Sequence, residues 1–293
     1  MRFRDRIVYP AFKKSGPTTL WLLKIILPVS LLVRFLDYFG VIALMADYLD
    51  PIFNYMGLPG STAIVFVTSI FLPLYAPLAI ITSMPITLRE LTILALMCQL
   101  AHNLPVESAV QARTGTTFWG MTLLRITASI ATGVVLNLIL PREMGMPFFT
   151  QTGIENMNSI PEVFLAWLKS SLGISLLITA IVFTLNLLYR LLEVYHIIPR
   201  LSKGVKPLLK VFGLPPSTSF LWLIGCIVGL AYGGALMMDQ MAVSHSVLED
   251  NLLFVALGVS IWWILGTRLI LAWLVVWARR GIIKIRSGKL LYT

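Results

Sequence analysis

The stretch "RFLDYFGVIALMADYLDPIFNYMGLPGST" (residues 34–62) decides the fold because the chain carries a second version of it. That version, "RLLEVYHIIPRLSKGVKPLLKVFGLPPST" (190–218), matches without a gap, and both end in Gly-Leu-Pro-x-Ser-Thr. The match resumes after a shift of thirteen residues, at the pairs His102/His245, Glu107/Asp250, Gly115/Gly258, Trp119/Trp262 and Arg125/Arg268. Apolar residues align easily by chance, whereas histidine, tryptophan and arginine do not. The pattern predicts an internal duplication.

Composition places this duplication in a membrane. Hydrophobic residues make up 58% of the chain and charged residues only 12%, which is too little polar surface for a soluble domain of 293 residues. The net charge of +10 does not indicate nucleic-acid binding, because the basic residues gather at a few loops and ends and form no arginine-rich module. We therefore expect an all-α polytopic membrane protein.

Six apolar stretches are long enough to cross about 30 Å of hydrocarbon. They are residues 18–45, 61–82, 115–140, 166–189, 217–238 and 251–278. A shorter stretch, 87–101, cannot cross alone and is expected to be half of a broken helix or one arm of a re-entrant hairpin.

The distribution of lysine and arginine orients these spans. Five basic residues lie in each of three regions: the N-terminal arm, residues 190–216 and the C-terminal tail. Residues 34–60 contain only one, and residues 239–250 contain none. The positive-inside rule then predicts a multi-pass inner-membrane protein with both termini in the cytoplasm. The basic N-terminal arm lacks the apolar core and cleavage site of a signal peptide.

The parity of the spans predicts how the two halves are related. Each half contributes about three spans, so the second half enters the membrane from the opposite side. We expect two Gate-like repeats of inverted topology: residues 1–150 with the basic N-terminal arm, and residues 151–293 with the basic C-terminal tail. In such proteins the site lies near the bilayer midplane at the repeat interface, where helices are often broken.

A helix break is predicted at His102–Leu104, because Pro105 disfavours helix at the residue before it and suits the first turn of a new helix. Helix capping by Asn103, by Glu107 and, in the second half, by Ser246 with Glu249 is one explanation for the polar residues here. Capping does not explain why His102 and His245 recur. A site that includes both histidines is the other explanation.

Arg125 and Arg268 lie inside long apolar stretches. An arginine at the bilayer centre costs about 2.5–3.5 kcal/mol on insertion scales unless it meets an acid, a carbonyl or a wet cavity. Glu107 and Asp250 are the expected partners. Either these ion pairs lock the two halves together, or the arginines bind or gate a solute.

Two stretches, "FLPLYAPLAI" (71–80) and "VGLAYGGALM" (228–237), follow the Gly-Leu-Pro blocks at equivalent positions. Their prolines and glycines are expected to interrupt a helix at membrane depth, where irregular backbone is tolerated if it lines a cavity. Tyr75 and Tyr232 nearly coincide and could contact a solute there. Ordinary packing of glycines between helices is the alternative.

Catalysis is not indicated, because the sequence contains no G-x-S-x-G, HExxH or Walker A motif. Cys98 and His102, one helical turn apart, could form half of a soft-metal site, but no cysteine precedes His245 in the same way. The sequence predicts no enzyme activity, no cofactor and no metal site.

The residues Gly57-Leu58-Pro59, "AHNLPVES" (101–108) and "SHSVLEDNLLFVALG" (244–258) resemble the nucleoside-recognition, or Gate-domain, membrane proteins. This family includes the spore maturation proteins A and B and is akin to the gate segments of ferrous-iron and concentrative nucleoside transporters. The resemblance covers both halves and implies a helical membrane fold. The polar signature of the true nucleoside transporters and the GTPase domain of the iron transporters are both missing.

The leading hypothesis is a transporter or channel for a small polar solute at the interface of the two repeats, and nucleoside-like solutes are among the candidates. The candidate pathway residues are Tyr75, His102, Asn103, Glu107, Arg125, Tyr232, His245, Glu249, Asp250 and Arg268. The alternative is a membrane scaffold or assembly factor in which the same residues are structural ion pairs. The expected partners are the lipid bilayer, a small polar solute, and a second copy or another membrane protein.

Overall fold

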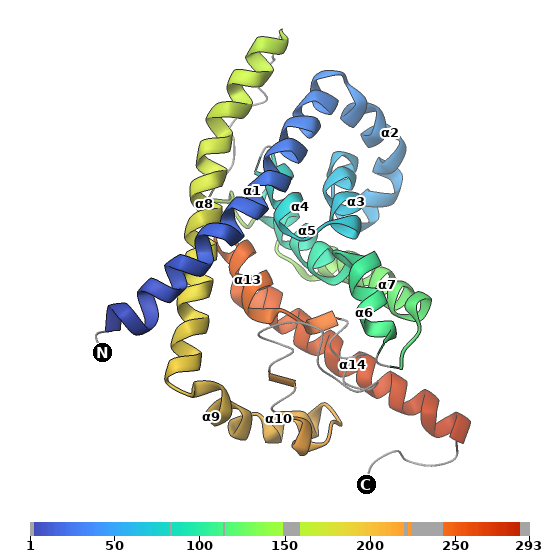
Figure 1. The fold of residues 1–293 in the computed structure, drawn as a ribbon. Coiled ribbons are helices and arrows are strands. Elements are labelled where there is room, and N and C mark those ends of the chain that lie inside the picture. The colour runs from blue at the N-terminus through green and yellow to red at the C-terminus, as the bar shows by residue number, and fades with distance from the viewer. Residues whose placement is uncertain are drawn as a thin grey trace.

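The computed structural model describes residues 3–82, 84–113, 115–148, 159–219, 222–223 and 243–287. Within these ranges the chain is helical and contains no strand, as expected (Figure 1). The first half comprises η1 (Arg4–Val8), α1 (Tyr9–Tyr38), α2 (Val41–Phe53), η2 (Asn54–Met56), η3 (Gly60–Thr62), α3 (Ala63–Phe71), α4 (Tyr75–Ile81), α5 (Leu88–Ala101), α6 (Leu104–Ala112) and α7 (Phe118–Ile139). The second half comprises α8 (Ile160–Val194), α9 (Ile197–Gly204), α10 (Lys206–Val211), η4 (Pro216–Thr218), α13 (Val247–Val255) and α14 (Ile261–Ser287).

Four described helices are long and apolar enough to cross a membrane: Arg4–Tyr38, Phe118–Ile139, Ile160–Val194 and Ile261–Ile282. The pair α5 and α6, bent by 40° at its break, counts as a fifth span if it crosses as one unit. The predicted span 217–238 lies largely outside the described residues. The described chain thus confirms a multi-spanning helical membrane protein with a broken helix.

Two predicted spans are not continuous helices. Residues 18–45 divide because α1 ends at Tyr38 and Gly40 turns the chain with a left-handed φ of +73°. Residues 61–82 divide into α3 and α4, which are separated by the extended residue Leu72 and by Pro73. Proline cannot donate the backbone hydrogen bond that would continue the helix. The predicted interruption at this position is therefore confirmed.

The local structure repeats at the two offsets found in the sequence. In the alignment of the two halves, α1 and α8 end at equivalent residues, and η3 and η4 occupy equivalent positions. Helices α6 (Leu104–Ala112) and α13 (Val247–Val255) begin and end at equivalent residues. The left-handed residues repeat as well, with Gly57 and Gly213 both at φ +69°. The duplicated sequence therefore encodes duplicated local structure. The opposed orientation of the two halves in the membrane stays a prediction.

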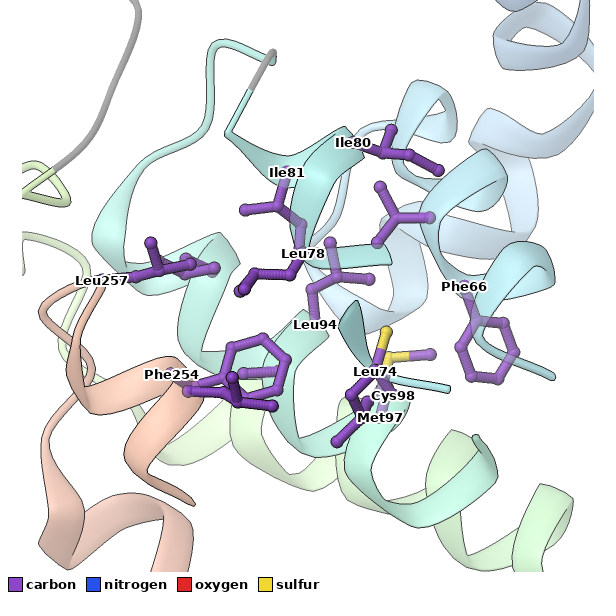
Figure 2. Packing of buried hydrophobic residues seen from close by; sticks show 14 of the residues in the cluster. Phe66, Leu74, Leu78, Ile80, Ile81, Leu94, Met97, Cys98, Phe254 and Leu257 are labelled. Carbon is purple, nitrogen blue, oxygen red and sulfur yellow. The ribbon is translucent and has the colours of Figure 1, made fainter. Parts of the chain in front are cut away.

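Helix α5 lies at the centre of the molecule, and every residue from Leu91 to Ala101 is buried. Its capping box, formed by Thr87 and Glu90, fixes where the helix begins. Phe254 of α13 and Leu257 extend from the second half toward the side chains of α4 and α5 (Figure 2). The core therefore joins the two halves through α5.

The long helices α1 and α8 cross and pack against each other (Figure 1). Three side-chain hydrogen bonds join them: Trp167 Nε1 donates to Ser30 Oγ at 3.0 Å, Asn186 Nδ2 to Ser15 Oγ at 3.2 Å, and Arg34 Nη2 to Ser170 Oγ at 3.1 Å. Side-chain hydrogen bonds of this kind add to van der Waals packing where lipid supplies no hydrophobic driving force. Apolar side chains of both helices also belong to the core cluster that surrounds α5.

Candidate functional site between the two halves

The site begins at the break between α5 and α6. His102 is extended (φ −77°, ψ 153°), Asn103 is left-handed (φ 47°), and Pro105 lies in the first turn of α6. This confirms the predicted break. The second half repeats the turn, because Ser246 has a φ of 45° immediately before α13 begins.

Arg125 of α7 binds back to this turn and is completely buried. Its Nε donates to the carbonyl of Leu100 at 2.8 Å, its Nη2 to the carbonyl of His102 at 3.0 Å, and its Nη1 to Glu107 Oε2 at 2.6 Å. The helix break exposes carbonyl oxygens that have no intrahelical partner, and the guanidinium supplies donors for them. Glu107 is thus confirmed as the partner of Arg125.

Arg268 of α14 makes the equivalent bonds and is also completely buried. Its Nε donates to the carbonyl of Val243 at 3.3 Å, its Nη2 to the carbonyl of His245, and its Nη1 to Asp250 Oδ2 at 3.2 Å. Asp250 is therefore confirmed as its partner. Through these hydrogen bonds, each arginine joins the spanning helix that carries it to the helix break of the same half. This set of bonds is called the arginine staple below.

Glu107 also reaches across to the second half. Its Oε1 lies 3.3 Å from His102 Nε2, and its Oε2 lies 3.1 Å from His245 Nε2. The two histidine Nε2 atoms are 3.4 Å apart. The structure therefore brings the duplicated histidines together around one carboxylate. These three side chains, His102, Glu107 and His245, are called the His–Glu–His cluster below.

The tautomer of His102 follows from its other ring nitrogen. His102 Nδ1 lies 2.9 Å from the carbonyl oxygen of Gln99, which can only accept a hydrogen bond. Nδ1 therefore carries a hydrogen, and in the neutral ring Nε2 presents a lone pair to the Glu107 carboxylate. Two acceptors that face each other at 3.3 Å repel unless a proton or another cation lies between them.

Further polar contacts surround the cluster and join the same two halves. Gln99 Nε2 donates to the carbonyl of Asp250 at 2.9 Å and to Asn251 Oδ1 at 3.1 Å. Tyr75 donates its hydroxyl hydrogen to Glu249 Oε1 at 2.7 Å. Gln99 and Asn251 were not singled out from the sequence. The signal was available, since each is a buried amide in an apolar stretch and needs a partner.

Side-chain capping does not explain Asn103, Ser246 or Glu249, whereas Glu107 does lie in the first turn of α6 as expected. Neither Asn103 nor Ser246 makes a side-chain cap hydrogen bond. Side-chain caps form from an extended residue, whereas both of these residues are left-handed. Glu249 bonds to Tyr75 rather than closing a capping box. The capping explanation is therefore wrong for these three residues.

The structure places the predicted site residues differently, and Tyr75 and Glu249 form the pair described above. His102, Glu107 and His245 form the cluster, and the arginines with Asp250 lie beside it. Asn103 contributes the backbone turn, its N–H donating to the carbonyl of Ser69 at 2.8 Å. Tyr232 lies outside the described residues. A role of any of these residues in binding a solute stays a prediction.

Comparison with known proteins supports the resemblance drawn from the sequence. A family model described as "Gate: Nucleoside recognition" matches residues 19–116, which include the helix break, His102 and Glu107. The chain is also 30% identical over 295 residues to "Uncharacterized membrane protein YvoD" of Bacillus subtilis (strain 168), covering 92% of this chain and 93% of the relative. No solved structure matches the chain.

Proposed function

Because the chain belongs to the nucleoside-recognition (Gate) family of membrane proteins, we propose that it moves a small polar solute across the membrane through the junction of its two halves. The His–Glu–His cluster is the site that the solute meets. Nucleosides are the first class to test, since the matching family description concerns nucleoside recognition. We assign the cluster to binding, with no catalytic step.

The observation that carries this proposal is the placement of the cluster. His102 and His245 are buried, come from different halves, and converge with Glu107 at a helix break. Ionisable residues at membrane depth are rare, and they commonly mark substrate or ion pathways. A helix break at the interface of two repeats is where many transporters bind their solutes.

The amides beside the cluster support a polar occupant. Gln99 Oε1 and Asn251 Nδ2 are buried and have no hydrogen-bond partner in the described part of the chain. A buried polar atom without a partner costs about 1–3 kcal/mol. Water or a polar solute at the junction can satisfy both atoms.

The arginines have a different part in this proposal from the one expected for them. Each guanidinium already donates to a carboxylate and to two backbone carbonyls. We propose that Arg125 and Arg268 hold the two helix breaks in shape, while the histidines and Glu107 meet the solute. We further propose that the halves are inverted repeats, and that both termini lie in the cytoplasm of an inner-membrane protein.

A second function, a membrane scaffold or assembly factor, is favoured by the same pairing. Both buried arginines are matched to acids within their own half, as structural ion pairs are. In that case the cluster joins the two halves and no solute passes. The partner would then be a second copy of the chain or another membrane protein.

The test is transport by the full chain in proteoliposomes. Purified protein is first screened by thermal shift against nucleosides, nucleobases and small organic anions, since a ligand that binds the native state raises the melting temperature. Flux of each hit is then measured for wild type, His102→Asn and His245→Asn. Flux lost in both variants, at unchanged melting temperature, supports transport. If no class of compound raises the melting temperature, and both variants are less stable than wild type, the result supports the scaffold.

A further inference from the structure

We propose that His102, Glu107 and His245 bind a divalent transition-metal ion of the borderline class, with Zn²⁺ the best fit. The proposal goes beyond solute transport, since it concerns what the cluster binds and holds whether or not an ion crosses the membrane. It also departs from the expectation of no metal, which considered donors within one half only.

The spacing of the donor atoms carries the proposal. Each residue offers one ligand atom, and these atoms all lie within 4.8 Å of one another. Two ligands about 2.0–2.1 Å from a zinc ion at a tetrahedral angle lie about 3.3–3.4 Å apart. The two Nε2 atoms are 3.4 Å apart, and the Glu107 oxygens lie 3.3 Å and 3.1 Å from them. One ion placed between them can therefore contact both imidazoles and the Glu107 carboxylate, whose two oxygens each face one of the histidines.

The orientation of His102 is that of a metal ligand. A ligating histidine normally donates its other N–H to a carbonyl or carboxylate, which fixes the tautomer and the ring. His102 Nδ1 does this with the carbonyl of Gln99 at 2.9 Å, leaving the Nε2 lone pair directed at the cluster. A cation between Nε2 and the Glu107 carboxylate removes the repulsion between these two acceptors.

The surroundings indicate which ion is preferred. Arg125 donates to Glu107 Oε2 at 2.6 Å and so neutralises part of the carboxylate charge. The imidazoles then supply most of the binding, which favours zinc, cobalt and nickel over magnesium and calcium. The positive charge of Arg125 also repels the metal ion, so we expect the affinity of the cluster for the ion to be modest and binding to be reversible. With three protein donors, at least one position remains for water or another exchangeable ligand.

The proposal is tested on the full chain, purified in nanodiscs and stripped with a chelator. Co²⁺ is titrated and followed by its visible absorption, and Zn²⁺ is then used to displace it. We expect one Co²⁺ per chain with a spectrum of nitrogen and oxygen ligands, displacement by Zn²⁺, and no displacement by Mg²⁺ or Ca²⁺. No Co²⁺ spectrum and no Zn²⁺ binding to wild type would overturn the proposal, and would leave a shared proton in the cluster instead.

Three matched variants locate the ion. Asparagine can keep the donor that His102 Nδ1 supplies to Gln99 while removing Nε2, so we use His102→Asn and His245→Asn. The control is His196→Asn, which replaces the remaining histidine, an exposed residue at the start of α9. We expect at least a tenfold loss of Zn²⁺ affinity in the first two and none in the control, because even indirect ligand partners are worth about 10–100-fold.

The results distinguish this proposal from the transport proposal. Zn²⁺ affinity unchanged in His102→Asn and His245→Asn, or lost in His196→Asn, would place the ion elsewhere and overturn the metal site, whatever the flux shows. Metal binding at the cluster with no flux of any solute would leave the metal site and remove transport. If the two variants fail to fold, the wild-type titration with Co²⁺ still decides whether a site exists.

Discussion

The two helix breaks of this protein share one arrangement, but the acid that binds the arginine is one methylene group longer in the first half than in the second. In both, an arginine donates to two carbonyls of the break and to a carboxylate in the first turn of the next helix. The first half has Glu107 and the second has Asp250 at the equivalent position. Glu107 extends from its arginine to both histidines, at 3.3 Å and 3.1 Å.

The arginines stabilise the backbone at both helix breaks, whereas Glu107 alone contacts the two histidines. The arginine staple is needed twice because each broken helix exposes backbone groups that lipid cannot satisfy. The longer carboxylate is needed only once, because a single group can bridge histidines that come from opposite halves. A duplicated scaffold thus carries one asymmetric centre.

The largest effect is expected from removing the staple. Arg125→Met or Arg268→Met leaves a buried carboxylate without its ion partner, which typically costs 3–5 kcal/mol. We expect little folded protein in the membrane for either variant, measured as the monodisperse yield. Arg190→Met is the control: Arg190 lies nearer the surface, where it pairs with Glu193 and donates from Nε to the carbonyl of Arg6 at 3.0 Å, and exposed contacts of this kind contribute about 1 kcal/mol each. Equal yields from all three variants would show that the staples are dispensable.

The asymmetry itself is tested by exchanging the two acids. Glu107→Asp keeps the charge but withdraws the carboxylate from the histidines, whereas Asp250→Glu changes an acid that lies beside its own arginine. A misplacement of about 1 Å in a site can cost up to about 100-fold in rate. We expect a loss of flux or ligand binding of at least tenfold in Glu107→Asp and a small change in Asp250→Glu. Equal effects would remove the functional distinction between the two breaks.

A smaller effect is expected at the contact between Tyr75 and Glu249, which joins the two halves beside the cluster. Tyr75→Phe removes one buried hydrogen bond of 2.7 Å and leaves Glu249 without it. We expect a loss of about 1–3 kcal/mol in stability, seen as a lower melting temperature. Tyr48→Phe, at a residue 77% exposed, should melt like wild type. If Tyr75→Phe had the same melting temperature as Tyr48→Phe, the contact between Tyr75 and Glu249 would contribute nothing to stability.

The smallest effects are expected at the duplicated glycines. An added methyl group at Gly57 would meet the side chain of Asn137, and one at Gly213 would meet the longer, more flexible Arg280. Both residues have a φ of +69°, which costs a side chain about 1–2 kcal/mol. We expect Gly57→Ala to lower the melting temperature more than Gly213→Ala. Gly173→Ala, in open space within α8, should raise it; a loss there as large as at Gly57 would contradict this reasoning.

Much of the architecture could be predicted from the sequence because membrane physics leaves few choices. A buried arginine in an apolar helix needs a partner, which led directly to Glu107 and Asp250. Pro105 located the helix break, and the repeated blocks located the matching local elements η3 and η4. Periodicity could not show that Glu107 of one half lies beside His245 of the other. That contact depends on how the start of α13 is held against the end of α5, where Gln99 bonds to Asp250 and Asn251.

Backbone detail at the breaks was also beyond sequence rules. Asn103 and Ser246 are common capping residues, and the rule assumes an extended backbone at the cap. Here both are left-handed, and their side chains do not cap. Tyr75 is 174 residues from Glu249 along the chain, and no local pattern relates them. Contacts across the junction therefore required the folded structure.

The central claim is that a pathway reaches the His–Glu–His cluster, and the most direct measurement is thiol accessibility. In a background with Cys98→Ala and Cys226→Ala, His102→Cys is treated with a membrane-impermeant thiol reagent in intact membranes. Leu94→Cys, completely buried in α5, is the control. We predict that His102→Cys is labelled and Leu94→Cys is not. Labelling of both only after denaturation would contradict a pathway and leave the cluster as a structural junction.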